Sequence, residues 1–307
     1  MIESKVKEKL KEEKVKKTTA EADVLKRKRK TLILMMLPIS VWLLAVVIIP
    51  VATMLNMSFK QVEGFVLKDV FTVNNYLKFF KVEMYWRLFL KSFRMAFIVA
   101  IVAIIISYPL AYFIARRIKK FKNILFMLII VPLWVSYLIR IIAWRSILGN
   151  RGFLNVFLMQ LGIIKEPLEI FLYNQFAVII TLIYIAIPFV FIPLYTALEK
   201  IPDALISASR DLGASGARTF MHVVLPLSRP GLVTGFMLSF IIALGDYIIP
   251  KELGGVGGIM YGNVIWHQFG LINDWPLGAA LGFILLTVAL IVLILSRKLG
   301  SKEGVFF

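Results

Sequence analysis

The side chains that commonly perform catalysis are few in this chain and far apart. The 307-residue sequence contains no cysteine and only two histidines, His222 and His267. Zero cysteines exclude thiolate catalysis, disulfides and cysteine-ligated metals. The sequence also has no Gly-x-x-x-x-Gly-Lys-Ser/Thr phosphate loop. We therefore expect no catalytic residue, no cofactor-binding residue and no metal site.

One carboxylate has an unusual position. Asp246 lies near the end of the apolar run GFMLSFIIALGDYIIP. An unpaired charge in the middle of a membrane costs about 3 kcal/mol or more, so this side chain must face protein or water. Arg140 and Arg145 lie in or beside another apolar segment and are possible ion-pair partners.

The elements that position these residues are six apolar segments. Hydrophobic residues make up 60% of the chain and the mean hydropathy is +0.84, whereas soluble domains are roughly 45 to 50% apolar. About 20 residues at 1.5 Å each cross a hydrocarbon layer about 30 Å thick. The predicted spans are 32–55, 96–115, 124–142, 176–198, 231–250 and 277–295.

These spans must be helices, because a helix satisfies its own backbone polar groups in lipid. No segment shows the alternation of a barrel strand. The first span is longer than the apolar part of a signal peptide and lacks a small-residue cleavage site, so we expect it to be retained. The sequence predicts an all-α polytopic membrane protein without a second, soluble domain.

The basic residues indicate the orientation. Lys and Arg number 12 in residues 1–31, 5 in 116–122, 4 in 199–230 and 3 after Leu295, which makes 24. The other three loops together contain only 9. Positive charge collects on the cytoplasmic side. We expect a basic cytoplasmic tail at 1–31, a six-span membrane domain at 32–296 and a cytoplasmic C-terminus at 297–307. The net charge of +18 then reflects orientation and headgroup attraction rather than nucleic-acid binding.

A polar segment, residues 201–230, interrupts the apolar pattern and predicts a helical hairpin. Pro202 suits a first helical turn, Asp203 favours the positive end of the helix dipole, and Gly213 suits a left-handed helix end. Ser215 can cap a second helix over 216–224 that Pro226 closes. Composition alone leaves two interpretations open: an ordinary connection between spans, or a docking element.

This hairpin carries a family resemblance. SASRDLGASGARTFMHVVLP, residues 207–226, resembles the cytoplasmic signature of ATP-binding cassette importer permeases. Ser207, Ala208 and Ser209 align with its Glu-Ala-Ala, Gly213 with its glycine, and Leu225 and Pro226 with its Leu-Pro end. Ser207 stands where the family has glutamate, and the nearby carboxylates that would take over its contact are Asp203 or Asp211.

The resemblance implies that the hairpin at 201–226 is the coupling helix that enters a groove on an ATPase subunit. Small Ala208 and Gly213 would allow close backbone approach, and Leu212 and Phe220 would be apolar anchors. The implied ATPase-coupling residues are Asp203, Ser207, Ala208, Ser209, Leu212, Gly213, Ala214, Phe220, Leu225 and Pro226.

Two further segments resemble one branch of these importers, the spermidine/putrescine permeases. Residues 132–155 are similar to their third span, and residues 243–280 to the segment between their last two spans. For a polyamine, Asp246 would be a transient ligand, with Tyr247 beside it. The aromatic residues would stack on ammonium groups or else anchor span ends at the membrane interface. The implied substrate-path residues are Asp246, Tyr247, Trp134, Tyr137, Arg140 and Trp144.

The implied protein is a permease subunit with alternating access, in a bacterial inner membrane. Its implied partners are a second homologous permease, two ATPase subunits and an extracytoplasmic substrate-binding protein. Three alternatives remain: a permease for another solute such as iron or thiamine, an ion-coupled secondary transporter, and an intramembrane enzyme. Inverted repeats would favour the second, and a Ser/His or paired-carboxylate constellation at one depth would favour the third. The sequence shows neither.

Overall fold

The computed structural model describes residues 2–64 and 66–300, and these divide into two compact units between Met57 and Ser58. The first unit consists of helix α1 (Ile2–Ser58), and its part Lys26–Ser58 is long and apolar enough to cross a membrane. The predicted tail at 2–31 is therefore helical and continuous with the first span. Residues 301–307 of the predicted C-terminal segment lie outside the described residues.

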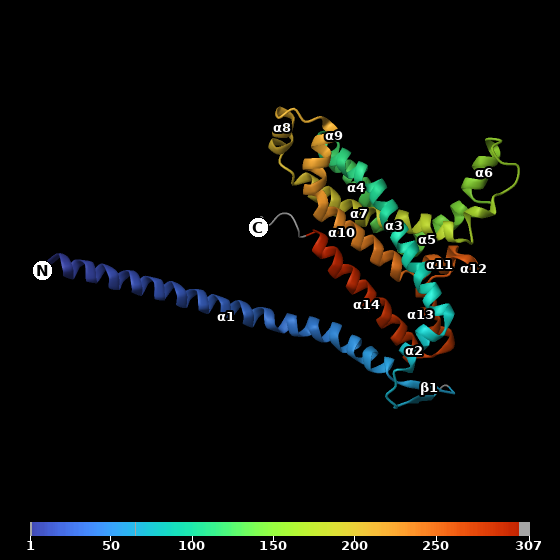
Figure 1. Cartoon of the computed structure of the whole chain (residues 1–307), viewed down its shortest axis with the longest axis horizontal. Coiled ribbons are helices and arrows are strands. Elements are labelled where there is room, and N and C mark those ends of the chain that lie inside the picture. The colour runs from blue at the N-terminus through green and yellow to red at the C-terminus, as the bar shows by residue number, and fades with distance from the viewer. Residues whose placement is uncertain (1, 65, 301–307) are drawn as a thin grey trace. The chain divides into compact units, whose positions relative to one another are not determined.

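The core of the second unit is built by three long helices that contact one another (Figure 1): α3 (Glu83–Arg116), α7 (Gln175–Glu199) and α10 (Leu225–Gly245). Small residues allow the close approach. A Cβ atom on Gly231 would lie 2.6 Å from the Pro193 carbonyl oxygen. Membrane helices associate by such packing, because lipid supplies little hydrophobic force between them.

The remaining elements surround this core. Helix α14 (Trp275–Gly300) packs on α10 and on α2 (Asn74–Lys81). Strands β1 (Gln61–Glu63) and β2 (Val66–Lys68) form an antiparallel hairpin. In Figure 1, α8 (Asp203–Asp211) and α9 (Gly216–Thr219) lie at one end of the long helices. Helices α11 (Ile248–Leu253), α12 (Gly255–Gly258) and α13 (Tyr261–His267) lie at the other end, with the π-helical turn η4 (Gln268–Ile272) following α13.

Four of the six predicted spans, 32–55, 96–115, 176–198 and 277–295, fall within helices that can cross a membrane. The third, 124–142, was wrong as a single straight helix. It divides into α4 (Lys122–Ile130) with the 3₁₀ turn η1 (Val131–Trp134), and α5 (Tyr137–Leu148) followed by α6 (Phe153–Gln160), with a bend of 97°. The described residues thus contain five candidate spans, or six if the bent pair is one span.

The bend has a local cause. Pro132 lacks a backbone N–H and disfavours a regular helix before it, and the chain tightens into the 3₁₀ turn η1 there. Val135 and Ser136 then adopt extended ψ angles of 137° and 138°, which interrupts the helical hydrogen bonds. As a result Tyr137 and Arg140 lie on a separate helix, α5, that packs on α7 and α11.

The fifth span also differs from its predicted bounds of 231–250. Helix α10 ends at Gly245, because Asp246 adopts an extended conformation with ψ 134° and the chain restarts as α11. Asp246 Oδ1 accepts a hydrogen bond from the Ile249 backbone N–H at 2.8 Å, as a capping carboxylate does. Asp246 is therefore at the junction of two helices and not inside a span.

Candidate functional site

The first candidate site is the hairpin, whose first arm is helix α8. Pro202 stands one residue earlier than predicted, immediately before the helix, with φ −62° and ψ 134°. Gly213 has φ +78°, which confirms the predicted left-handed helix end. The Gly213 N–H donates to Arg210 O at 2.8 Å and the Ala214 N–H to Ser209 O at 3.1 Å. These two bonds form a Schellman motif, which requires that left-handed residue.

The second arm begins as predicted but does not end as predicted. The Ser215 side chain accepts a hydrogen bond from the Arg218 N–H at 3.3 Å, so the cap is confirmed. Pro226 does not close the arm: helix α9 continues through the π-helical turn η3 (Phe220–Val224) into α10, giving one candidate span, Gly216–Gly245. A wider π turn absorbs the missing N–H and the bulk of the proline ring. The second arm and the fifth span are therefore one continuous helical segment.

The side chains at the turn of the hairpin are open to a partner. Leu212 is 89% exposed, Ser207 and Ala208 are exposed, and no atom lies within 4 Å of a Cβ built on Gly213. Phe220 differs from its predicted role as an anchor. Its ring packs edge-on against Tyr108 and Tyr112 of α3, with centroids 5.7 and 5.8 Å apart. Phe220 thus fixes the hairpin to the bundle.

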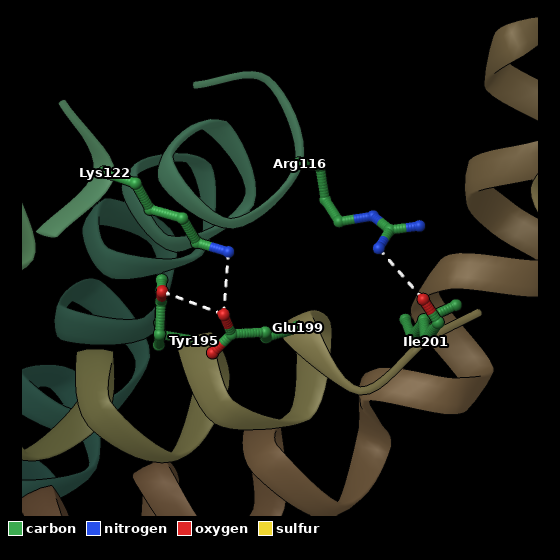
Figure 2. A network of polar contacts seen from close by, with 5 residues as sticks. All are labelled: Arg116, Lys122, Tyr195, Glu199 and Ile201. Carbon is green, nitrogen blue, oxygen red and sulfur yellow. Dashed lines mark hydrogen bonds and ion pairs between the residues drawn. The ribbon is translucent and has the colours of Figure 1, made fainter. Parts of the chain in front are cut away.

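Two polar contacts beside the base of the hairpin (Figure 2) were missed by the sequence analysis: one joins α3 to the start of the hairpin, and the other joins α4 to the last turns of α7. Arg116 Nη1 donates to the Ile201 carbonyl at 2.9 Å. Lys122 Nζ donates to Glu199 Oε1 at 2.7 Å, and the Tyr195 hydroxyl donates to the same oxygen at 3.3 Å. The basic segment 116–122 was interpreted only as an orientation signal, although two of its cations make these specific contacts.

The second candidate site surrounds Asp246, at the opposite end of α10. The Tyr137 hydroxyl of α5 donates a hydrogen bond to Asp246 Oδ2. Neither expected arginine forms an ion pair with Asp246 within the part of the chain that the structure describes, and Arg145 instead pairs with Glu252 at 3.1 Å. Of the two interpretations left open for Asp246, the structure thus gives no support to the arginine pair, and Tyr137 is the side chain that contacts the carboxylate.

Burial makes the charge of the Asp246 carboxylate less favourable than it is in water. Burial raises the pKa of Asp246, which lies just beyond the end of the span, to about 6, although backbone hydrogen bonds from Ile249 and Ile248 act in the opposite direction. The Arg140 guanidinium lies over the Tyr137 ring, 5.6 Å from its centroid. Arg140 Nε and Nη1 are buried without a hydrogen-bond partner among the described residues. Tyr137 thus connects a partly unsatisfied cation with a carboxylate.

The other aromatic residues of the predicted path are dispersed. Tyr247 stacks on Trp266, with ring centroids 6.1 Å apart and an interplanar angle of 14°. Trp144 packs against Tyr184 of α7 at 5.3 Å, and Trp134 is 77% exposed. The structure brings Tyr137, Arg140 and Asp246 together and gives Trp144 a packing contact. No group of three or more His, Asp or Glu side chains in the described residues could hold a metal ion.

The chain matches a known protein family over most of the second unit. The family described as "Binding-protein-dependent transport system inner membrane component" matches residues 107–302. This range contains the bent pair α4–α5, the hairpin and the Asp246 junction. Both candidate sites therefore lie inside the matched region.

The sequence is similar to curated relatives over most of its length. It is 38% identical to the spermidine/putrescine transport system permease protein PotB of Salmonella typhimurium, over 85% of this chain and 92% of the relative. It is 37% identical to PotB of Escherichia coli, over 85% of this chain and 96% of the relative. Among solved structures, a bacterial alginate ABC transporter in complex with a periplasmic protein bound to an alginate pentasaccharide aligns with a TM-score of 0.69, at 17% identity, over 91% of this chain and 98% of that one.

Proposed function

This chain belongs to the family of binding-protein-dependent transport system inner membrane components, and from that premise we propose that it is the permease subunit of an ATP-driven polyamine importer. The protein is a transporter subunit and not an enzyme. The observation that carries the substrate class is the 37 to 38% identity to spermidine/putrescine permeases over 85% of the chain.

The hairpin supports a separate ATPase as the partner. Gly213 permits close backbone approach of a partner, and the turn around it is open, with Leu212 89% exposed and no atom within 4 Å of a Cβ built on Gly213. The proposed assembly contains two ATPase subunits, a second homologous permease and an external binding protein. The alginate transporter, which shares this fold, was solved in complex with a periplasmic protein bound to an alginate pentasaccharide. The surface that would face such a protein is formed by α11 to α13.

The proposed orientation puts both termini and the hairpin in the cytoplasm of a bacterial cell, because 24 of the basic residues gather on that side. The Asp246 junction then faces outward. This arrangement places the ATPase contact and the delivery side for the substrate at opposite ends of α10.

The proposed mechanism is alternating access, in which the long helices transmit movement from the hairpin to the Asp246 junction. Closure of the ATPase subunits on ATP moves the hairpin, whose second arm is continuous with α10. The Arg116 contact carries the same movement to α3, and the Lys122 contact with Glu199 at the end of α7 carries it from α7 to α4. At the far end, displacement of α10 against α5 changes the contact between Tyr137 and Asp246. A carboxylate released from Tyr137 becomes available to a cation.

Uptake measurements test this function. The gene should be deleted in its host and replaced by the wild-type gene or an empty vector. We expect uptake of radiolabelled spermidine and putrescine to disappear with the empty vector, while thiamine and iron uptake stay unchanged. Unchanged polyamine uptake together with lost thiamine or iron uptake would reassign the substrate class.

A further inference from the structure

An aromatic surface close to Asp246 already holds an ammonium group. The Lys251 Nζ atom lies 4.3 Å from the centroid of the Trp266 indole ring. An ammonium group at this distance from an indole face makes a cation–π interaction, and indole is the side chain that favours it most. Lys251 is exposed and forms no ion pair among the described residues, whereas the neighbouring Glu252 is paired with Arg145.

The backbone holds this aromatic surface in place. A Cβ on Gly262 would lie 2.8 Å from the Asp246 carbonyl oxygen, so the start of α13 touches the Asp246 junction. Asn263 Nδ2 donates to the Tyr247 carbonyl at 2.8 Å. Trp266 follows Asn263 by three residues, which places both on neighbouring positions of the same helix. The two contacts therefore fix Trp266 opposite Tyr247, on which it stacks.

Lys251 reaches the indole from a separate helix. It follows Tyr247 by four residues, and the Lys251 N–H donates to the Tyr247 carbonyl at 3.2 Å. Residues four apart lie on one side of a helical turn, so Tyr247 and Lys251 both approach Trp266 from α11. Within the described part of the chain, the Lys251 ammonium group contacts the ring and forms no ion pair, and it is carried on a long flexible stem. A soluble ammonium group offers the same chemistry to the ring.

We propose that the Trp266 indole face is a binding site for a primary ammonium group, occupied by Lys251 in the absence of substrate and taken over by one ammonium group of the arriving substrate. That the substrate is a polyamine rests on the proposed function. Asp246 precedes Tyr247 directly, and consecutive Cα atoms are about 3.8 Å apart. Asp246 is therefore the carboxylate nearest in sequence to the Tyr247–Trp266 stack, and we assign to it the next charge of a linear polycation.

Competition predicts opposite effects for the two partners. Calorimetric titration of the purified full-length chain in detergent, with spermidine and with butylammonium, measures the dissociation constant directly. We expect Lys251→Met, which keeps the length but removes the competing charge, to lower the dissociation constant about two- to tenfold. Trp266→Leu should raise it by a similar factor, and Lys251→Arg should stay close to wild type.

The absence of cysteine permits a chemical control at the same position. Lys251→Cys can be modified with an aminoethyl thiosulfonate reagent, which restores a tethered ammonium group, or with the neutral ethyl reagent. The aminoethyl product should bind spermidine like wild type, and the ethyl product should bind it more tightly. Equal affinity for the two products would overturn the competition, even if Trp266→Leu does not fold.

The outcomes separate this site from the proposed function. If cells import polyamines but neither Lys251 nor Trp266 variants change the dissociation constant, the ammonium site is refuted and the importer stands. If butylammonium affinity shifts as expected while the deletion leaves polyamine uptake intact, the site stands and the polyamine assignment fails. A purely structural role would lower the thermal stability of both variants without opposite shifts in affinity.

Discussion

Arg116 on the last turn of α3 donates to the carbonyl of Ile201, the residue at which the hairpin begins, with 2.9 Å between Nη1 and the oxygen. The arginine side chain is only 10% exposed. Its Nη2 also lies 2.8 Å from Asp203 Oδ1, as a charge contact and not a directed hydrogen bond. One buried cation thus joins the core of the bundle to the element that we propose meets the ATPase.

These two contacts should differ in strength. Arg116→Met leaves the Ile201 carbonyl without its donor, and a hydrogen bond from a charged group contributes roughly 1.5 to 3 kcal/mol to the free energy of unfolding. Asp203 is 94% exposed, so Asp203→Asn should cost under about 1 kcal/mol. Thermal unfolding in detergent measures both. Equal losses for the two variants would contradict a buried backbone contact as the main anchor.

Gly213 is expected to be necessary for ATPase docking. Gly213→Val places a β-branched residue at φ +78°, which strains the Schellman turn and adds bulk at its exposed tip. We expect co-purification of the ATPase and uptake to fall sharply while the protein remains in the membrane. Retained binding with unchanged transport would refute the docking assignment.

Gly162 provides a matched control for this strain. It has φ +69°, also has no atom within 4 Å of a built Cβ, and lies between α6 and the 3₁₀ turn η2 (Glu169–Phe171). Gly162→Val carries a similar backbone penalty outside the hairpin. It should lower thermal stability as Gly213→Val does but keep the ATPase bound.

The sequence predicted the parts of the fold that depend on local rules. Apolar length located four spans, and the turn chemistry of Gly213 and Ser215 located both caps of the hairpin. The sequence did not predict the effect of a proline on a helix, because a proline can either bend the helix or be accommodated in it. Pro132 accompanies a bend of 97°, whereas Pro226 is absorbed in a continuous helix, and the packing partners that decide between these outcomes are distant in sequence.

The candidate sites were predictable to a similar degree. Asp246 was identified because a carboxylate in an apolar run is costly, but the sequence left its partner open between the substrate and an arginine and did not indicate Tyr137. Tyr137 lies 109 positions away, and only the bend after η1 brings it to Asp246. Phe220 was predicted to be an apolar anchor for the ATPase. The π turn that begins at Phe220 directs its ring toward Tyr108 instead, and amino-acid composition does not indicate where a π turn forms.

The orientation can be tested by labelling, since the chain has no native cysteine. A cysteine at Ser4 should resist an impermeant maleimide in intact cells, because the basic residues of the tail hold it in the cytoplasm. Val256→Cys is the outward control, at a side chain that is 90% exposed beyond α11. It should react. The reverse pattern would invert the proposed topology.

Asp246 should matter more for transport than for stability. In Asp246→Asn an amide oxygen still accepts from the Ile249 N–H, and no arginine loses an ion pair. We expect normal membrane abundance, with the barrier to polyamine uptake raised by roughly 1 to 3 kcal/mol, the contribution of one charge-assisted contact. Poor expression would instead indicate a structural role.

Tyr137→Phe separates the charge of Asp246 from its hydrogen bond. It removes the donor to Oδ2 but keeps the ring beneath Arg140 and the charge on the carboxylate. Uptake should be retained to a greater extent than in Asp246→Asn. If both variants lose uptake equally, the hydrogen bond rather than the charge is what the transport cycle needs.

The pH dependence of uptake provides the sharpest test of Asp246, because its two consequences have opposite signs. Burial raises the pKa of this carboxyl to about 6, so its charge is present above about pH 6 and lost as the pH falls to 5. Uptake relative to Asp246→Asn should therefore decrease over that interval.

The stability of the fold should change in the opposite direction. The native state holds the proton on Asp246 more tightly than the unfolded chain, in which the pKa of this carboxyl has its ordinary value of 3.8. The resulting contribution to the free energy of unfolding is complete below pH 3.8 and disappears as the pH rises through 6. Thermal stability relative to Asp246→Asn should accordingly increase from pH 7 to 5. A wild type and variant that change in parallel in both measurements would remove Asp246 from the transport mechanism.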